Sequence, residues 1–380
     1  MVDPERALDA CARDGLDLRA GHGLARHLQA APPCLRLADL PTPVERAAWL
    51  DAAGVEVWLK RDDQSSTLYG GGKVRKLEWL LASPPFNGDE PILSIGGIGS
   101  HHLVALALNL HGLGRKLHAL TFDQVFTPHV EANLATLMSL GAEIWDVRTR
   151  VGLPVAWLSY HLWRRPADKG VSMAPGASNG LGGFGFVAGG LELAAQIDGG
   201  EVPRPATIYI TGGSAGSSAG LAIGLALAGV GCHLRIVSAV ERWSFNRLLF
   251  RRMLGQIAAT LAVYGLDPAR LRGGVAGLLA EAGVTWSIDH SQVGGGYAVP
   301  TADGRVVIAR AADHGLHLDA TYTGKCLAGL TADLGRGDVP GPVLLWNTHG
   351  PNDLRRWIDP DWRSRLPAGL RGRLDALRER

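Results

Sequence analysis

Lysine is the scarcest charged residue of this chain. Only six of its 38 basic residues are lysines, so arginine supplies nearly all of the positive charge. Because arginine provides most of the positive charge at the surface, each of the few lysines is expected to have a specific role. The best placed of the six, Lys73, follows three glycines at the start of a predicted helix.

Cysteine is also rare, and its copies are widely spaced. The four cysteines, Cys11, Cys34, Cys232 and Cys326, include no C-x-x-C pair. Structural zinc sites and disulfide frameworks both depend on characteristic cysteine spacings. We therefore expect neither, and no metal site is predicted.

The chain has neither an excess of one charge nor a long apolar run. Its net charge of +2 argues against a nucleic-acid partner. Eight arginines between residues 355 and 380 are interrupted by acidic residues, which is typical of a solvated helix face. No unbroken apolar stretch reaches the length of a membrane span, and the first residues lack the apolar region of a signal peptide. We therefore expect a cytoplasmic protein with no membrane partner.

Glycine, in contrast, is abundant, with 51 residues among 380. Short apolar strands, glycine-rich turns and helices alternate along the chain. The predicted strands are residues 55–60, 91–94, 117–122, 143–147, 206–211 and 232–239, and the predicted helices are 102–113, 128–140 and 186–196. This alternation predicts an α/β fold with mostly parallel strands, whose ligands bind at the carboxyl ends of the strands.

The segment Gly70-Gly-Gly-Lys73 places an amine in the first turn of a predicted helix. The positive end of the helix dipole disfavours the protonated form of such a lysine, and partial burial lowers the pKa of its amine further. A neutral lysine amine can attack a carbonyl group and form a Schiff base. Taken alone, the segment is explained equally well by a loop and a solvated helix start, with no reactive amine.

A second glycine-rich turn follows the predicted strand at 206–211. It offers backbone N–H groups, hydroxyls and a helix N-terminus, which together favour phosphate binding. Its residues are Gly212, Gly213, Ser214, Ala215, Gly216 and Ser217. The turn fits neither a Walker loop nor G-x-G-x-x-G, and both a nucleotide site and glycines that only permit close packing remain open. A phosphate site combined with a reactive lysine suggests pyridoxal 5′-phosphate.

Seven segments, in order along the chain, resemble the 1-aminocyclopropane-1-carboxylate deaminase and D-cysteine desulfhydrase family. They are Leu40-Pro-Thr-Pro43, Lys60-Arg-Asp-Asp63, Gly70-Gly-Gly-Lys73-Val-Arg-Lys-Leu-Glu78, Ser94-Ile-Gly-Gly-Ile-Gly-Ser100, Gly180-Leu-Gly-Gly-Phe-Gly185, Gly296-Tyr297-Ala-Val-Pro300 and Tyr322-Thr-Gly-Lys325. The resemblance implies the tryptophan-synthase-β-like α/β architecture called fold type II. Two open, twisted, mostly parallel sheets are flanked by helices, and the enzyme is usually a homodimer.

In that architecture a small domain is inserted in a large one. We accordingly predict a small α/β domain at residues 81–189. The large cofactor-binding domain is predicted at residues 36–80 together with 190–380. Residues 1–35 are interpreted as a helical extension that precedes both.

Positions within the motifs imply roles for individual residues. Lys73 would carry the cofactor and move protons at the substrate carbon. The turn at 212–217 would bind the cofactor phosphate. Ser100 would bind the substrate carboxylate or transfer a proton, and Tyr297 and Tyr322 would face the substrate.

Further roles follow from the same resemblance. His101 stands where an asparagine usually contacts the cofactor 3′-oxygen, and His101 and His102 are candidates for substrate binding. Thr323 and Thr348 are candidates for contact with the cofactor ring nitrogen. Lys76 is expected to be a structural surface residue.

Several positions depart from the usual family pattern. Gly72 and His101 each replace asparagine, and Asn347-Thr-His349-Gly350 stands where His-Thr-Gly-Gly is common. These positions line the implied cofactor and substrate sites, so their side chains affect which substrate can bind. A metal site made by the histidines is not expected, because adjacent histidines at a helix start point in different directions.

Thr323 bears on the choice of reaction. The resemblance implies that deaminases carry glutamate after the tyrosine, where it keeps the ring nitrogen protonated, and that desulfhydrases carry threonine. A hydroxyl makes a weaker electron sink, which suffices when a leaving group soon takes the electrons away. This disfavours the cyclopropane-opening reaction.

We therefore expect a pyridoxal-phosphate-dependent carbon–sulfur lyase or deaminase. It would act on a small amino acid, such as D-cysteine, by α,β-elimination and release a 2-oxo acid and ammonia. Open alternatives within the family are ring-opening 1-aminocyclopropane-1-carboxylate deamination, cysteate sulfo-lyase activity and β-replacement. The alternative from another class is a non-catalytic protein that binds a nucleotide or the cofactor.

Overall fold

The computed structural model describes residues 23–378, apart from residues 31, 53, 351 and 352. The chain divides into two compact units. In the described part, the larger unit comprises residues 23–79 and 178–350, and the smaller unit comprises residues 80–177 and 353–378. Most of the predicted N-terminal extension, residues 1–22, lies outside the described residues.

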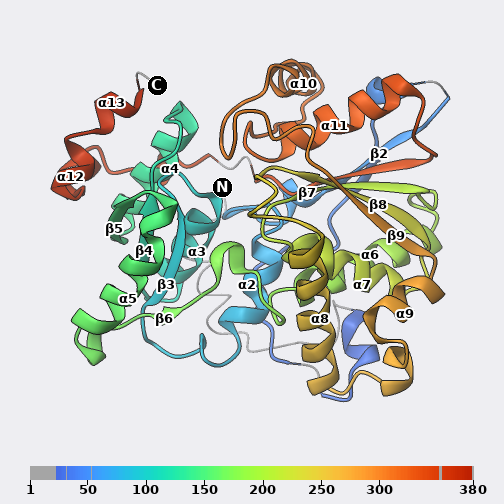
Figure 1. The fold of residues 1–380 in the computed structure, drawn as a ribbon, viewed down its shortest axis with the longest axis horizontal. Helices are drawn as coiled ribbons and strands as arrows, with labels where there is room; N and C mark the ends of the chain where they lie inside the picture. The colour runs from blue at the N-terminus through green and yellow to red at the C-terminus, as the bar shows by residue number, and fades with distance from the viewer. Residues whose placement is uncertain (1–22, 31, 53, 351–352, 379–380) are drawn as a thin grey trace. The chain divides into compact units, whose positions relative to one another are not determined.

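The larger unit is built on a six-stranded sheet with the order β1-β2-β10-β7-β8-β9 (Figure 1). Its strands are β1 (Val44–Arg46), β2 (Val57–Arg61), β7 (Thr207–Gly212), β8 (Cys232–Ser238), β9 (Val284–Asp289) and β10 (Val343–Asn347). Only β1 pairs antiparallel, at the β2 edge, and all the other pairs are parallel. Every residue of β7 and β10 is buried, as expected for strands covered on both faces.

Side-chain alternation along the strands assigns the two faces of this sheet. Ile208 and Ile210 of β7 pack in one apolar cluster, which includes α6 (Phe184–Asp198), α7 (Gly216–Leu227), α8 (Arg247–Val263) and α9 (Gly274–Glu281). Tyr209, between them, packs in a second cluster with α10 (Ala302–Asp313) and α11 (Thr323–Arg336). Figure 1 shows α10 and α11 on one face of the sheet and α6 to α8 on the other. Period two along the strand produces this separation.

Two helices on the same face, α6 and α7, approach closely because glycines line their contact. A Cβ atom on Gly224 would lie 2.2 Å from the carbonyl oxygen of Val187, and one on Gly220 would lie 2.3 Å from that of Gly183. Close packing of the two helices therefore explains Gly220 and Gly224. The glycines of the second glycine-rich turn, residues 212–217, have different surroundings.

The smaller unit contains a four-stranded parallel sheet with the order β5-β4-β3-β6. Its strands are β3 (Ile92–Gly97), β4 (Leu117–Phe122), β5 (Glu143–Arg148) and β6 (Val171–Ser172), and its long helices are α3 (His101–Gly112), α4 (Pro128–Ser139) and α5 (Leu153–Trp163). The predicted strand at 117–122 coincides with β4. The other predicted elements of this unit agree with the structure within a few residues.

The C-terminal residues pack within the smaller unit, whereas the predicted boundaries placed them in the large domain. Short helical turns here include Trp362–Arg365, α12 (Ala368–Arg371) and α13 (Leu374–Arg378). Trp362, Leu366 and Leu370 are buried in one apolar cluster with residues of α4. Arg373 also forms ion pairs with Asp123 and Asp146. Buried leucines between the arginines explain why this stretch is not simply a solvated helix face.

Along the chain, α2 (Val74–Leu81) lies between β2 and β3, and it starts directly after Lys73.

The sequence prediction of an α/β fold with two mostly parallel sheets is confirmed. Within the described residues, none of the helices is long and apolar enough to cross a bilayer.

Candidate functional site

The three-glycine turn before α2 packs against the segment that follows β10. The N–H of Gly72 donates to the carbonyl oxygen of Thr348 at 3.0 Å. Gly71 has a φ of +98°, and a Cβ atom on it would lie 2.6 Å from that same Thr348 oxygen. A Cβ atom on Gly72 would lie 2.6 Å from the ring of Phe186. The Phe186 ring thus occupies space that an asparagine at position 72 would need.

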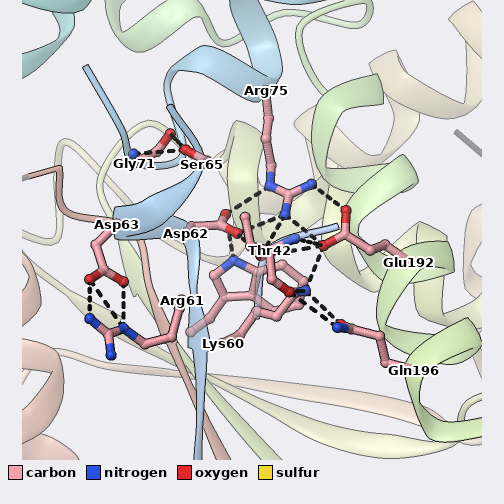
Figure 2. Close-up of polar contacts among 11 residues, drawn as sticks. Thr42, Lys60, Arg61, Asp62, Asp63, Ser65, Gly71, Arg75, Glu192 and Gln196 are labelled. Carbon is pink, nitrogen blue, oxygen red and sulfur yellow. Dashed lines mark hydrogen bonds and ion pairs between the residues drawn. The ribbon is translucent and has the colours of Figure 1, made fainter. Parts of the chain in front are cut away.

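A buried ionic cluster fixes α2 behind this turn (Figure 2). Arg75 donates to both carboxylate oxygens of Asp62 at 2.7 and 2.9 Å, and to both carboxylate oxygens of Glu192 at 2.9 Å. Lys60 donates to Glu192 at 2.5 Å and to the carbonyl oxygen of Thr42 at 2.6 Å. Two cations therefore balance two carboxylates. These contacts join β2, α2 and α6 into one rigid support for Lys73.

Lys73 itself is half-buried. Burial lowers the pKa of its amine, and the negative charge of Asp319 partly opposes this effect. A lowered pKa increases the fraction of neutral amine near pH 7, which is the form that attacks a carbonyl carbon. This agrees with the chemistry expected from the position of Lys73 at a helix start.

Lys76 is fully buried, so the expectation of a surface position is wrong. Its Nζ donates to the Ser178 hydroxyl at 2.9 Å, and that hydroxyl lies 2.7 Å from the hydroxyl of Ser214. A Cβ atom on Gly216 would lie 2.9 Å from Lys76 Nζ. Burial lowers the pKa of the Lys76 amine well below its usual range, and the charge of Lys73 lowers it further. The buried amine therefore lies against the second glycine-rich turn.

That turn has the features of an anion site. Ala215, the residue before α7, has a left-handed φ of +65° and makes no side-chain cap to the helix. Such a conformation costs a non-glycine residue about 1–3 kcal/mol and concentrates at functional sites. Backbone N–H groups at a helix start, the Ser214 and Ser217 hydroxyls and a buried amine form a donor set that suits a phosphate group.

The predicted tyrosines, Tyr297 and Tyr322, lie side by side. Their hydroxyls are 3.1 Å apart, and their rings meet edge to face with centroids 6.0 Å apart. A Cβ atom on Gly213 would lie 3.3 Å from the Tyr322 ring. The structure thus brings Tyr297 and Tyr322 together with the glycine-rich turn.

The carboxylate of Asp319 binds the backbone at the start of α11, where the predicted site residues Tyr322 and Thr323 lie. Its carboxylate accepts hydrogen bonds from the N–H groups of Thr321, Tyr322 and Thr323 at 2.8–3.0 Å. It also accepts one from the Thr323 hydroxyl at 2.8 Å. His349 Nδ1 lies 3.9 Å from the same carboxylate.

Ser100, His101 and His102 belong to the smaller unit. Ser100 is the N-cap of α3, and His101 Nε2 lies 3.0 Å from Nε2 of His129. His102 is buried, with its Nε2 2.9 Å from the Ser94 hydroxyl. Its side chain is therefore used in the interior of the unit. No group of three or more metal-ligating side chains occurs among the residues described.

Two of these residues were missed by sequence reasoning. Asp319 lies two and three residues before Thr321 and Tyr322, a spacing at which an aspartate side chain bonds the backbone of its own turn, and this signal was available. Lys76 follows Lys73 by one helical turn, and the scarcity of lysine was the available signal. The assembled features are a reactive amine, an anion cradle and hydroxyl groups, which fit pyridoxal 5′-phosphate.

Comparisons with known proteins agree with this fit. The sequence matches the family described as pyridoxal-phosphate dependent enzyme over residues 35–348. A D-cysteine desulfhydrase of Salmonella paratyphi A is 30% identical over 328 residues, covering 84% of this chain and 94% of that protein. A D-cysteine desulfhydrase of Salmonella schwarzengrund is 29% identical with the same coverage.

Two solved structures show the same fold at lower identity. A homologue of ACC deaminase has a TM-score of 0.68 at 20% identity, covering 90% of this chain and 98% of its own. An L-serine ammonia-lyase from Rhizomucor miehei has a TM-score of 0.54 at 16% identity, covering 86% and 98%.

Proposed function

The chain belongs to the family of pyridoxal-phosphate-dependent enzymes, and on this premise we propose that it deaminates a small β-substituted amino acid by α,β-elimination. Membership confirms the predicted cofactor, enzyme class and family resemblance. The observation that carries the proposal is the similarity to D-cysteine desulfhydrases over nearly their whole length. D-cysteine or a related β-substituted alanine is the proposed substrate.

The larger unit supplies the residues proposed to hold the cofactor. Lys73 would be its covalent attachment point. The turn from Gly212 to Ser217 would bind its phosphate, assisted by Lys76. Thr323 and Thr348 would lie toward the ring nitrogen. When bound, the cofactor supplies the electron sink that stabilises negative charge at the substrate α-carbon.

The reaction begins with loss of the α-carbon proton and cleavage of the bond to the leaving group. Lys73 would accept the proton from the α-carbon. The bond between the β-carbon and the leaving group then breaks, and the leaving group departs with the electron pair. Tyr297 or Tyr322, whose hydroxyls are 3.1 Å apart, would donate a proton to it. Hydrolysis of the remaining enamine releases a 2-oxo acid and ammonia.

In the smaller unit, Ser100 is proposed to bind the substrate carboxylate. His101 is proposed to act beside it, in place of the usual asparagine. A homodimer remains a family-based proposal, which light scattering on the purified protein would test.

Cofactor binding tests the proposal directly. Purified protein with added pyridoxal 5′-phosphate should show a visible absorption band from the lysine-bound cofactor, which borohydride reduction fixes to the peptide carrying Lys73. Protein that remains colourless would contradict the proposal and favour a non-catalytic role.

Replacing Lys76 should weaken cofactor binding. We expect Lys76→Met to raise the dissociation constant for pyridoxal 5′-phosphate about 10- to 100-fold, because a hydrogen bond to a charged group contributes about 1.5–3 kcal/mol. Absorbance titration of the cofactor-free variant measures this constant. Methionine fits an apolar interior, and Lys116→Met, at an exposed position, is the matched control. An affinity equal to that of the control would exclude Lys76 from the phosphate site.

A further inference from the structure

A carboxylate and a histidine, Asp319 and His349, lie together next to Thr323. Asp319 and His349 are both buried, with side-chain exposures of 5% and 7%. Asp319 was not predicted, whereas His349 was among the departures from the family pattern at the implied sites and stands where the resembling family usually has glycine. The separation of 3.9 Å between Nδ1 and the nearer carboxylate oxygen is within ion-pair range. It is too long for a hydrogen bond from a neutral imidazole.

The hydrogen bonds of Asp319 fix its position in the site. Both carboxylate oxygens accept from backbone N–H groups at the start of α11, so the side chain cannot turn away without losing several bonds. The Thr323 hydroxyl donates to the carboxylate and accepts from the Asp319 N–H at 3.0 Å. The orientation of that hydroxyl is therefore set by Asp319. The carboxylate is a fixed charge at the predicted ring-nitrogen end of the site.

The charge of Asp319 also reaches Lys73. It raises the pKa of the Lys73 amine against the lowering effect of burial. Burial raises the pKa of Tyr69 and lowers the pKa of Lys325, and the charge of Asp319 has an upward effect on both. Lys325 Nζ donates to the carbonyl oxygens of Val293 and Gly296.

We propose that Asp319 and His349 form a charge pair that controls the protonation of Lys73, with His349 offsetting the carboxylate only while the imidazole is protonated. Histidine changes its charge between about pH 5 and 8. At low pH the imidazolium neutralises Asp319, which leaves Lys73 more easily deprotonated. At high pH the neutral imidazole no longer offsets the carboxylate, which then favours the ammonium form of Lys73. Both residues are positioning residues, and the proposal rests on the role of Lys73 in the proposed function.

Chemical labelling of Lys73 tests this without turnover. The full-length protein, freed of cofactor, is treated briefly with formaldehyde and cyanoborohydride at pH 6 and pH 9, and mass spectrometry quantifies methylation of the Lys73 peptide. Only the neutral amine reacts, so the rate reports the protonation state. The exposed Lys116 in the same digest is the internal control.

Two variants, His349→Gly and Asp319→Asn, should change the labelling rate of Lys73 in different ways. His349→Gly should label at Lys73 about three-fold or more slowly than wild type at pH 6 and equally fast at pH 9. Asp319→Asn should label faster than wild type, because it removes the charge that favours the ammonium form. His349→Gln replaces the glycine variant if thermal melting shows that the latter is unfolded.

Equal labelling of the histidine variant and wild type at pH 6 would overturn the proposal. So would a difference that is the same at both pH values, since it would indicate a packing effect. The proposed function fails separately, through the absence of a visible band when the cofactor is added to wild-type protein.

Discussion

Replacing Lys73 by alanine should abolish the visible absorption of the cofactor complex and lower the rate of 2-oxo acid release at least about 10³-fold. The variant loses both the attachment amine and the proposed base at the α-carbon, and a positioned acid or base alone contributes about 10²- to 10⁴-fold. The free energy of unfolding should change by no more than about 1 kcal/mol, because the residue is half-buried and burial already disfavours the charge of its amine. Stopped assays of the keto acid measure the rate.

Lys116→Ala provides the matched control for this variant, since it removes an exposed lysine from the smaller unit. It should keep the absorption band and the activity of the wild type. A Lys73→Ala protein that retained the band together with near wild-type activity would show that another amine carries the cofactor.

Replacing Arg75 by methionine should strongly destabilise the larger unit. Asp62 and Glu192 would remain buried with Lys60 as the nearby cation, and breaking a buried ion pair costs about 3–5 kcal/mol. Urea unfolding followed by fluorescence measures this loss. A change below about 1 kcal/mol would contradict the role given to the cluster in Figure 2.

The pH dependence of stability provides a second measure of the same cluster. Arg75 and Lys60 hold the pKa of Glu192 at about 2, against an ordinary value of 4.5, despite an opposing effect of burial. Wild-type protein therefore keeps this contribution above about pH 4.5 and loses it as the pH falls toward 2. Arg75→Met should lose part of that dependence. Arg355→Met, which breaks the exposed pair with Asp353, should show no measurable change.

The sequence predicted the architecture well because its strands and turns carry strong local signals. Residues 117–122 are mostly apolar and coincide with β4, and the run that ends at Gly212 forms a central strand buried throughout. The C-terminal stretch was harder to assign. Its arginines suggested a solvated surface, whereas the burial of Trp362 and Leu366 depends on the tertiary position of α4.

The sequence led most directly to a site proposal where chemistry and motif order coincide, as for Lys73 and the turn at 212–217, and these roles stay predictions. The burial of the charged side chains of α2 was not predictable from the sequence. Arg75 and Lys76 resemble surface residues in sequence, and their burial depends on partners more than a hundred positions away, at Glu192 and Ser178. Asp319 was missed for a different reason. Its role depends on a helix start and on His349, which comes 30 positions later in the sequence.

The most direct test of the account is product analysis with a panel of amino acids. The holoprotein would be incubated with D- and L-cysteine, other β-substituted alanines and 1-aminocyclopropane-1-carboxylate, and keto acid and ammonia would be measured. Elimination predicts equimolar 2-oxo acid and ammonia from at least one β-substituted amino acid, with sulfide when the substrate is cysteine. Keto acid from the cyclopropane substrate alone, or from none of them, would contradict it.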